Sequence, residues 1–294
     1  MFFNDKISGT ILRQKKLESD PLWGNSPNTP FFPWVGGKRK LLNQIHLRLP
    51  QRFNNYIEPF VGGGAVFFSL APEKAVINDF NPEVTNAYRV VRDYPDELIE
   101  ELGWLTHSEM TFNTLKHMDR DKSLLNRQSP VVRAARFIYL LKASFSSKWD
   151  VNAKDEFINV SDKAIPEGRI FVDDKYEKVI YNCNRHLQGA HILTGDFMGV
   201  KPYIKKGDFV YIDPPYAETW VGYTGQGFDS GMQERVKELC DYIDSIGAYF
   251  MVSNSNVKFI HELYQRFNVN VVEFHRGLQT NKKEKVSEVL VTNY

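Results

Sequence analysis

The 294-residue chain has few cysteines, no long apolar run and almost no net charge. Cys183 and Cys240 are its only cysteines, and they have neither the spacing of a metal site nor that of a disulfide framework. This shortage fits a reducing compartment, and we expect a cytoplasmic protein. The apolar runs are too short to cross a bilayer, and the N-terminus lacks the apolar core of a signal peptide. The sequence therefore predicts neither a membrane span nor a metal site.

The formal net charge of +1 excludes a uniformly basic surface, but the charges are unevenly distributed. Residues 83–110 hold seven acids and two arginines, whereas residues 111–150 hold eight lysines or arginines and three acids. A basic segment inside a near-neutral chain indicates a local anionic partner. The alternative is a basic face that contacts only solvent.

From residue 31 onward, segments typical of strands alternate with segments typical of helices. Strands are expected at residues 55–60, 74–80, 191–197, 208–216, 248–255 and 269–274, and helices at 65–71, from Pro82 onward, at 131–143 and at 230–247. Asn81 is placed to cap the helix that starts at Pro82. Ser230 and Gln233 have the spacing of a capping box, and Gly247 is placed to end that helix. The alternation predicts a doubly wound α/β sheet.

The alternation stops between about residues 100 and 185, where we expect a largely helical insertion. The predicted division is a catalytic domain of residues 31–99 and 186–294 with an inserted domain of residues 100–185. Residues 1–30 are polar and irregular, and we predict an N-terminal extension to which the sequence assigns no function.

Two motifs follow neighbouring strands of the predicted sheet, and ligands of open α/β sheets bind where the strands end. In "EPFVGGG", Gly62, Gly63 and Gly64 follow a strand directly and allow the backbone to approach a ligand closely, although a tight turn would also favour glycine. Asp79 ends the next strand in "INDFN", where an acid commonly accepts hydrogen bonds from ribose hydroxyls. The alternative for Asp79 is a helix cap.

The third motif, "DFVYIDPPY", ends a buried strand with Asp213, Pro214, Pro215 and Tyr216. The prolines donate no backbone hydrogen bond, so they stop the strand and leave carbonyls as acceptors. Asp213 adds a carboxylate acceptor, and Tyr216 adds a flat ring face. Two acceptors beside a stacking surface suit a planar base with an exocyclic amine. The alternative is a proline-rich turn with an aromatic side chain at the surface.

The segment Asp213–Tyr216 resembles the [D/N/S]-P-P-[Y/F/W] motif of amino-methyltransferases, which methylate adenine at N6 or cytosine at N4. The stretches "FFPWVGGKRKLL", "YIEPFVGGGAVFF", "VINDFNPE", "GDF", "SNS" and "KKEKVSEVLVTNY" also resemble motifs of Dam-like DNA adenine methyltransferases. The resemblance covers most of residues 31–294. It implies a Rossmann-like methyltransferase sheet, S-adenosylmethionine as the methyl donor and double-stranded DNA as the partner, read by an inserted target-recognition domain.

The resemblance also implies roles for individual residues. The catalytic residues would be Asp213, Pro214 and Tyr216. The cofactor-binding residues would be Trp34, Gly36, Gly37, Lys38, Phe60, Gly62, Gly63, Gly64, Asp79, Asp196, Phe197 and Asp213. Within that set, Lys38 would lie near the amino-acid end of the cofactor and Asp79 at its ribose, while Asp196 and Phe197 would lie beside its adenine.

The chemistry of an exocyclic amine fits these roles. The lone pair of such an amine is delocalised into the ring, so it is a poor nucleophile until acceptors such as Asp213 and the Pro214 carbonyl take up its protons. The amine is out of reach inside a duplex, so the base would have to be flipped out and stacked on Tyr216. Three alternatives stay open: a cytosine-N4 enzyme, an enzyme acting on RNA or protein, and an inactive DNA-binding relative. A cytosine-C5 enzyme would need a nucleophilic cysteine, which neither cysteine resembles.

The predicted target-reading segment departs from the family. Dam-like enzymes that read GATC carry an F-N-G-x-x-R hairpin, whereas this chain has "FSSKWD", with Ser146, Ser147 and Asp150 at the Asn, Gly and Arg positions. An Arg donates two hydrogen bonds to guanine, which Asp cannot do, so we expect a site other than GATC or a relaxed one. The expected DNA contacts are Arg133, Lys142, Ser146, Lys148, Trp149, Asp150, Lys282, Lys283 and Lys285. The alternatives are that Trp149 belongs to the core and that Ser146 and Ser147 only form the turn of the hairpin.

Overall fold

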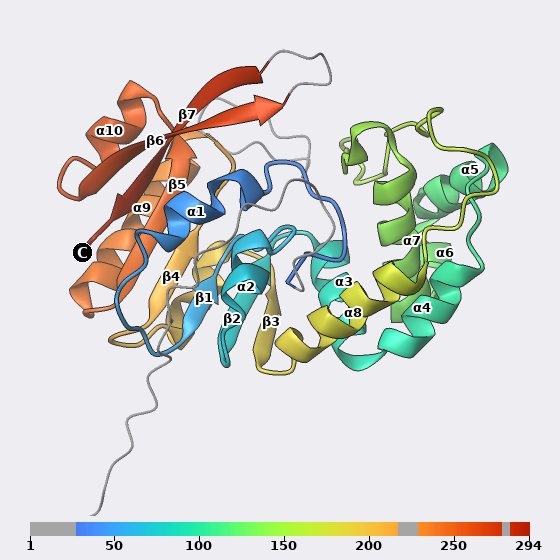
Figure 1. Cartoon of the computed structure of the whole chain (residues 1–294), viewed down its shortest axis with the longest axis horizontal. Helices are drawn as coiled ribbons and strands as arrows, with labels where there is room; N and C mark the ends of the chain where they lie inside the picture. The colour runs from blue at the N-terminus through green and yellow to red at the C-terminus, as the bar shows by residue number, and fades with distance from the viewer. Residues whose placement is uncertain (1–27, 217–228, 278–282) are drawn as a thin grey trace, which may run out of the picture.

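The computed structural model describes residues 28–216, 229–277 and 283–294. A central sheet has helices on both faces, and a group of further helices extends to one side (Figure 1). The strands are β1 (Tyr56–Glu58), β2 (Ala75–Asp79), β3 (Ala190–Thr194), β4 (Phe209–Ile212), β5 (Tyr249–Ser255), β6 (Asn268–Gly277) and β7 (Lys283–Thr292). The α-helices are α1 (Leu42–His46), α2 (Ala65–Leu70), α3 (Pro82–Asp93), α4 (Pro95–Gly103), α5 (Glu109–His117), α6 (Lys122–Arg127), α7 (Pro130–Ala143), α8 (Asp174–Leu187), α9 (Ser230–Ser245) and α10 (Lys258–Leu263). Short 3-10 helices are η1 (Lys38–Leu41), η2 (Met118–Arg120), η3 (Phe145–Ser147) and η4 (Phe197–Tyr203).

The seven strands lie in the order β3-β2-β1-β4-β5-β7-β6. Strands β1 to β5 are parallel, whereas β7 runs antiparallel to both β5 and β6. The chain builds outward from β1 to β3 and then returns to place β4 beside β1, so the direction of winding reverses between β1 and β4. This confirms the predicted doubly wound fold, and it marks the gap between the carboxyl ends of β1 and β4 as the place where such folds bind ligands.

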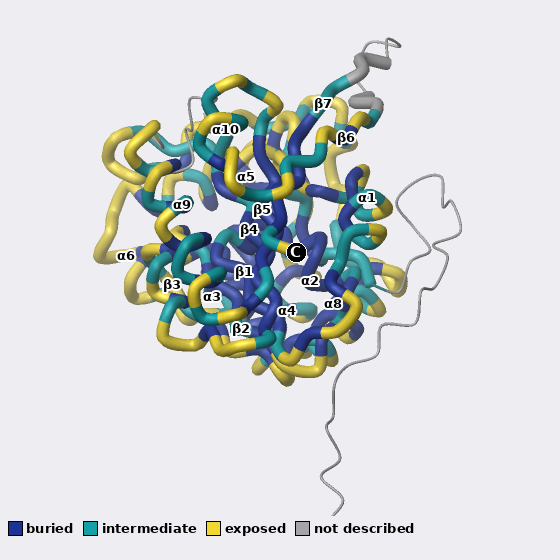
Figure 2. Tube along the Cα trace, turned by 90° about the vertical axis from the view of Figure 1, so that its left-hand side faces the viewer, coloured by how far each residue is buried: buried dark blue, intermediate teal, exposed yellow. Residues whose placement is uncertain are grey.

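Alternate side chains of β4 pack on opposite faces of the sheet. Phe209 and Tyr211 belong to the apolar cluster beneath α1, α2, α3 and α8, and Val210 and Ile212 belong to the cluster beneath α9 and α10. All four side chains are fully buried, as Figure 2 shows for the strands at the centre of the molecule. A strand buried on both faces reads as the continuous apolar run seen in the sequence.

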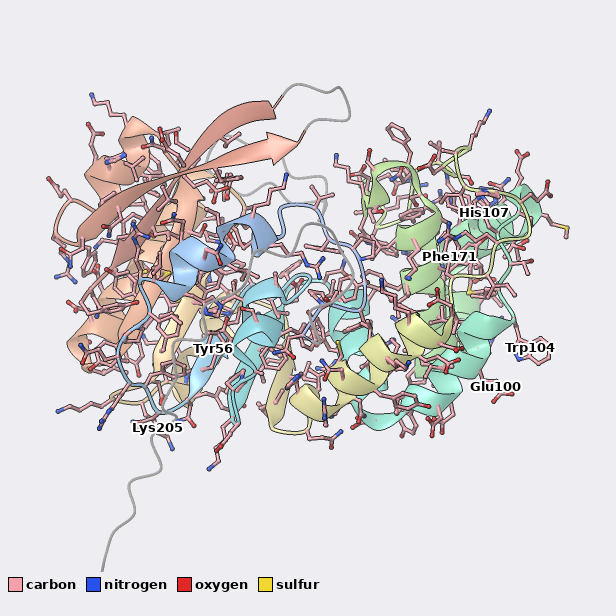
Figure 3. All side chains as sticks on the ribbon, viewed as in Figure 1. Tyr56, Glu100, Trp104, His107, Phe171 and Lys205 are labelled. Atoms are coloured by element: carbon pink, nitrogen blue, oxygen red, sulfur yellow. The ribbon has the colours of Figure 1, made fainter. Side chains whose placement is uncertain are left out.

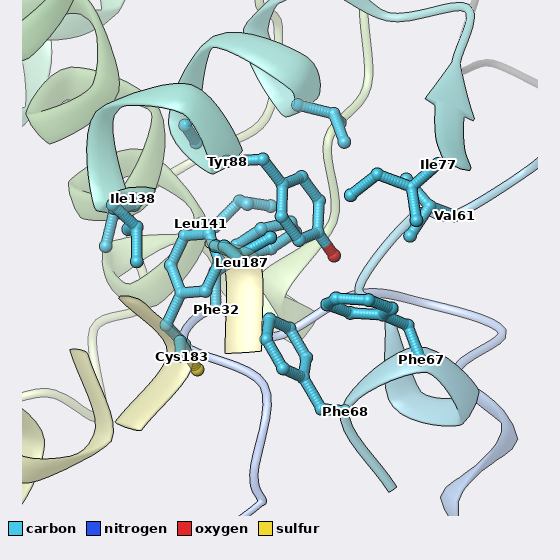
Figure 4. Packing of buried hydrophobic residues seen from close by; sticks show 14 of the residues in the cluster. Phe32, Val61, Phe67, Phe68, Ile77, Tyr88, Ile138, Leu141, Cys183 and Leu187 are labelled. Carbon is cyan, nitrogen blue, oxygen red and sulfur yellow. The ribbon is translucent and has the colours of Figure 1, made fainter. Parts of the chain in front are cut away.

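The helices between β2 and β3 share a core with the sheet. The Phe32 ring lies 5.2 Å from Phe137 of α7 and 5.8 Å from Tyr88 of α3, measured between ring centroids. Figure 4 shows Phe32 and Tyr88 packed with Ile138 of α7 and Cys183 of α8. The insertion is largely helical up to residue 143 and again over α8, as predicted. Its division from the catalytic domain at residues 100 and 185 stays a prediction, because one apolar cluster spans both parts.

Two details of the predicted elements can be compared with the structure. Asn81 caps α3, since its side chain accepts a hydrogen bond from the Glu83 amide with Pro82 at the first turn, as predicted. The prediction of a capping box formed by Ser230 and Gln233 is wrong. Asp229 caps α9 instead by accepting from the Met232 amide, and the Gln233 side chain turns away from the helix start. The strand β7 was not predicted, because its lysines and acids interrupt the apolar pattern.

Candidate active site

The predicted motifs converge at the point where the direction of winding reverses. Asp213–Tyr216 follow β4 directly, and the glycine loop follows β1 on the neighbouring strand. Asn78 of β2 ties the surrounding loops together, because its side-chain amide donates to the carbonyls of Pro59 and Gly195, both at 3.0 Å. Asn78 therefore joins the ends of β1, β2 and β3 at this edge of the sheet.

Lys38 lies against the Asp-Pro-Pro-Tyr segment. Its Nζ is 2.8 Å from Asp213 Oδ1, donates to the Gly36 carbonyl at 3.1 Å and lies 4.8 Å from the centre of the Tyr216 ring. The Lys38 side chain is buried, so this ion pair is shielded from solvent. The motif around Gly36, Gly37 and Lys38 thus reaches the segment Asp213–Tyr216 as well as the region predicted to hold the cofactor.

The carboxyl of Asp213 is tuned by two opposing effects. Burial raises its pKa from 3.8 to about 6, and the positive charge and hydrogen bond of Lys38 act in the opposite direction. Near neutral pH the carboxylate is therefore mostly ionised and can accept hydrogen bonds. The negative charge of Glu288 nearby also raises the pKa of Asp213.

Glu288 is a residue of this site that the sequence did not reveal. It lies buried on β7, and Ser253 Oγ of β5 donates to its Oε2 at 3.1 Å. Burial is the main cause that raises the pKa of Tyr216, and the charges of Asp213 and Glu288 and a hydrogen bond with Glu288 add to it. The only signal of Glu288 in the sequence was an acidic residue inside the otherwise mostly apolar stretch "VSEVLV".

The glycine loop makes room for the protein's own side chains. A Cβ on Gly62 would lie 2.7 Å from Trp34 Nε1, and one on Gly63 would lie 2.9 Å from Trp34 Cβ. A Cβ on Gly64 would lie 2.5 Å from the Tyr88 hydroxyl, which donates to the Gly62 carbonyl at 3.0 Å. The groups that approach these glycines in this structure are Trp34 and Tyr88. The close approach of a ligand to this loop stays a prediction.

Asp79 braces the same loop. Its Oδ2 accepts from the Gly62 amide at 2.9 Å, and its Oδ1 accepts from the Asn81 amide at 2.9 Å. Burial raises its pKa from 3.8 to about 6, although these amide hydrogen bonds oppose the shift. A role at a ribose stays a prediction, and the structure adds that Asp79 shapes the loop after β1.

Asp196, Phe197 and Phe60 lie together at the ends of β3 and β1. The rings of Phe60 and Phe197 are 5.0 Å apart at 30°, and the guanidinium of Arg235 lies 5.0 Å from the centre of Phe197. Asp196 caps η4 through the Met198 amide and forms an ion pair of 3.0 Å with Arg235. The arrangement offers aromatic faces beside a carboxylate, and Arg235 was not among the predicted site residues.

Two of the expected DNA contacts need correction. Trp149 is only 5% exposed and packs between Phe137 and Phe157, with ring centroids 4.7 and 4.8 Å away. It is a core residue, which was the alternative considered for it. Lys142 lies 3.5 Å from the centre of the Tyr176 ring, and burial lowers its pKa to about 8. An ammonium held against that ring is not presented to a DNA backbone.

The remaining expected contacts differ in how they are held. Arg133 of α7 is paired with Glu83 of α3. Lys148 forms an ion pair of 3.3 Å with Asp150 and is largely exposed. Lys283 and Lys285 belong to β7, while Lys282 lies outside the described residues.

The turn after α7 has a strained backbone and exposes an aromatic side chain. Ser146 and Ser147 both have positive φ, 57° and 50°, which a serine adopts only when its surroundings impose it. Phe145, which precedes them, is 51% exposed, although a large aromatic side chain is normally buried. Sequence reasoning noted the serines and missed Phe145.

Three basic residues of the 111–150 stretch hold the backbone of residues 155–159 in place. Lys116 Nζ donates to the carbonyls of Ile158 and Asn159, at 3.1 and 2.7 Å. Arg120 donates to the Phe157 carbonyl at 2.9 Å, and Lys122 donates to the Asp155 carbonyl at 3.1 Å. The excess of positive charge in this stretch therefore serves the fold of residues 155–159 as well as any anionic partner.

Within the described ranges, no helix is long and apolar enough to cross a membrane. Over the same residues, no group of three or more His, Cys, Asp or Glu side chains could hold a metal ion. His107 and Phe171, which Figure 3 shows in the helical group far from the sheet, have ring centroids 6.1 Å apart and form part of its packing.

Comparison with known proteins gives one consistent family. The model of the D12 class N6 adenine-specific DNA methyltransferases matches residues 34–278. A type II methyltransferase of Lactococcus lactis subsp. cremoris is 39% identical over 274 residues, which cover 90% of this chain and 95% of that protein. A type II methyltransferase of Methanocaldococcus jannaschii is 35% identical over 290 residues, covering 90% and 99%. The DNA adenine methylase of Escherichia coli K12 is 26% identical over 270 residues, covering 90% and 94%.

Proposed function

This chain belongs to the D12 class of N6 adenine-specific DNA methyltransferases, and from that premise we propose that Asp213, Pro214 and Tyr216 carry out its transfer of a methyl group to adenine N6, with S-adenosylmethionine as the donor. The observation that carries the proposal is the buried carboxylate of Asp213, held by Lys38 beside the Tyr216 ring where β4 ends. Such a carboxylate would be costly to bury without a function.

The chain's own groups supply what the adenine amine lacks. The Asp213 carboxylate and the Pro214 carbonyl accept hydrogen bonds from the two amine N–H groups, so the nitrogen moves toward a tetrahedral form and its lone pair is freed from the ring. One of these protons leaves once the N–C bond has formed. The Tyr216 ring stacks on the flipped base and offsets part of the few kcal/mol that flipping costs. Holding the amine about 3–3.5 Å from the group it attacks supplies much of the rate. S-adenosylmethionine supplies an electrophilic methyl group on a sulfonium, so no covalent enzyme intermediate is needed.

The residues beside this centre fit the donor. Phe60 and Phe197 offer aromatic faces at the ends of β1 and β3, and Asp79 and Asp196 add carboxylates at the ends of β2 and β3. Aromatic faces and carboxylates both favour a cation such as a sulfonium. The proposed set is Trp34, Gly36, Gly37, Lys38, Phe60, Gly62, Gly63, Gly64, Asp79, Asp196 and Phe197.

For DNA, we propose contacts on the side of the molecule where the turn after α7 and the joined ends of β6 and β7 lie (Figure 1). Phe145 has the exposure and the rigid turn that an apolar wedge between bases requires. The other proposed contacts are Arg133, Ser146, Lys148, Asp150, Lys283 and Lys285. Trp149 is not among them because it is buried, and Lys142 is not among them because its ammonium lies against the Tyr176 ring.

The test is direct methylation of DNA. Purified protein is incubated with a labelled donor and plasmid DNA that lacks methylated bases, and the nucleosides are separated. We expect label in N6-methyladenine and far less of it with the Asp213→Ala variant. Label in N4-methylcytosine, or no label at all, would contradict the proposal and support one of the alternatives drawn from the sequence.

A further inference from the structure

The catalytic loop depends on a fully buried glutamine of α9. Gln233 has no exposed surface, and its Nε2 donates to the Pro215 carbonyl at 2.8 Å. The capping box predicted with Ser230 would have folded this side chain back onto the start of the helix. Here Asp229 performs that capping, so the amide of Gln233 is left for the loop.

The orientation of this amide is set by a second one. The Asn254 Oδ1 accepts from the Ser255 amide at 2.8 Å, which leaves its Nδ2 to donate. That Nδ2 donates to Gln233 Oε1 at 2.9 Å. Because Oε1 is occupied as an acceptor, Nε2 is the end of Gln233 that faces Pro215. The hydrogen bonds therefore run in one direction, from the β5 backbone through Asn254 and Gln233 to the Pro215 carbonyl.

The Pro215 carbonyl controls the direction of the catalytic loop. The rings of Pro214 and Pro215 fix φ, but they leave ψ free to rotate. The ψ of Pro215 sets both where its carbonyl points and where the next residue, Tyr216, begins. A donor that holds this carbonyl in one orientation therefore also holds Tyr216. Pro215 has no N–H, so its carbonyl is the backbone group through which the loop can be held there.

We propose that Gln233 is a positioning residue for methyl transfer, that it aligns Tyr216 and the Pro214 carbonyl by holding the Pro215 carbonyl, and that Asn254 fixes Gln233 for this purpose. The inference rests on the proposed catalytic role of Asp213–Tyr216 and extends it to α9 and β5. It assigns a role to the "SNS" stretch, of which the resemblance gave only the sequence.

The test compares single-turnover methyl transfer with binding of the methyl donor. Gln233→Glu keeps the size of the side chain and its acceptor for Asn254, and at a pH where the carboxyl is ionised it places an oxygen without a hydrogen against the Pro215 carbonyl. Gln233→Met removes the donor without adding a charge. We expect both variants to lose about 100-fold in single-turnover rate, as for a misplaced reacting group, while the dissociation constant for S-adenosylmethionine is unchanged. Asn254→Asp, which can no longer donate to Gln233, should lose less.

The matched control is Cys240→Ala. Cys240 is also fully buried, and it lies two turns further along the same face of α9. The Cys240→Ala variant should have a lower melting temperature and an unchanged single-turnover rate. The inference is overturned if Gln233→Met or Gln233→Glu turns over like wild type, if Cys240→Ala loses as much rate, or if donor binding weakens in parallel with the rate. Near-normal turnover of Asp213→Ala would instead contradict the proposed catalytic site itself.

Discussion

Lys38 and Asp213 form an ion pair of 2.8 Å between the first residue of η1 and the end of β4, two segments far apart in the sequence. The pair joins the motif assigned to the cofactor with the motif assigned to the target base. Because the Lys38 side chain is buried, the attraction is screened little by salt. The charge of Lys38 in the first motif therefore influences the pKa of Asp213 in the second.

Replacing Asp213 by Ala should reduce methyl transfer by about 100- to 10,000-fold, the range for losing a group that accepts protons in the reaction. Binding of S-adenosylmethionine, measured by calorimetry, should change little because Asp213 acts on the amine. The control is Asp208→Asn at the other end of β4, near Lys205 at the lower edge of the sheet in Figure 3. Asp208 accepts from Asn55 and Lys205, so its loss should lower stability and spare turnover. Near-normal turnover by Asp213→Ala would remove it from the catalytic role.

Removing Lys38 should move the acid limb of the pH–rate profile upward. The pKa of Asp213 is about 6, and Lys38 keeps it from rising further. Only the ionised carboxylate accepts the amine protons, so kcat/KM should fall as the pH drops through about 6 in the wild type. In Lys38→Met this fall should begin at a higher pH. The exposed Lys40, changed to Met, is the control and should leave the profile in place. An unshifted limb in Lys38→Met would mean that Asp213 does not govern it.

Replacing Asp79 by Ala should weaken binding of S-adenosylmethionine by on the order of 1–3 kcal/mol, as expected for a lost hydrogen bond to a charged group. The variant also frees the amides of Gly62 and Asn81, so a lower melting temperature should accompany it. Asn81→Ala removes the cap of α3 and should lower stability by about 1 kcal/mol without weakening the binding. Titrations that give equal affinity for wild type and Asp79→Ala would take Asp79 out of the site.

DNA affinity should fall with added salt. The slope of log affinity against log salt concentration should be smaller than if all eight basic residues of the 111–150 stretch contacted phosphates. Lys116, Arg120 and Lys122 already donate to the backbone of residues 155–159. Lys148→Gln should lower the slope of log affinity against log salt by about 1, whereas Lys116→Gln should leave it unchanged. Fluorescence anisotropy over a range of salt concentrations gives both slopes. Equal changes in the two variants would show that Lys116 contacts phosphate.

The enzyme should modify adenines outside GATC. Asp150 stands where the family's GATC readers have an arginine, and it forms an ion pair with Lys148. A carboxylate cannot donate to guanine, so about 1–3 kcal/mol of discrimination is lost at that base. Long-read sequencing of DNA modified by this protein reports the base and its context together. If essentially every methylated adenine lies in GATC, other residues have taken over the reading.

The sheet and its motifs could be predicted from the sequence because they depend on local patterns. The run Phe209–Ile212 indicates a strand buried on both faces, and the order of the motifs predicts which strand ends meet. The role of Gln233 could not be predicted, because a glutamine three residues after a serine fits a capping box equally well. Only the position of Asp229 and the nearby Pro215 carbonyl decide between the two.

Residues in the helical insertion were harder to interpret, because charge and aromatic character do not reveal partners. Trp149 reads as an exposed ring between polar neighbours, yet Phe137 and Phe157 enclose it. Lys116 reads as a free cation, yet two carbonyls hold it. Glu288 was missed because its partner Ser253 comes from another strand and the pairing of β5 with β7 was not predicted.

The continuous aromatic packing from Phe32 to Phe137 limits how target preference can be exchanged between relatives. A graft that replaced only the helices after α3 would bring foreign side chains against Phe32 and Trp34, whose rings lie 5.2 and 6.1 Å from Phe137. Trp34 in turn lies over Gly62 and Gly63, so a misfit there would reach the catalytic edge of the sheet. Chimaeras that keep their activity should therefore be those that transfer residues 31–34 together with the insertion.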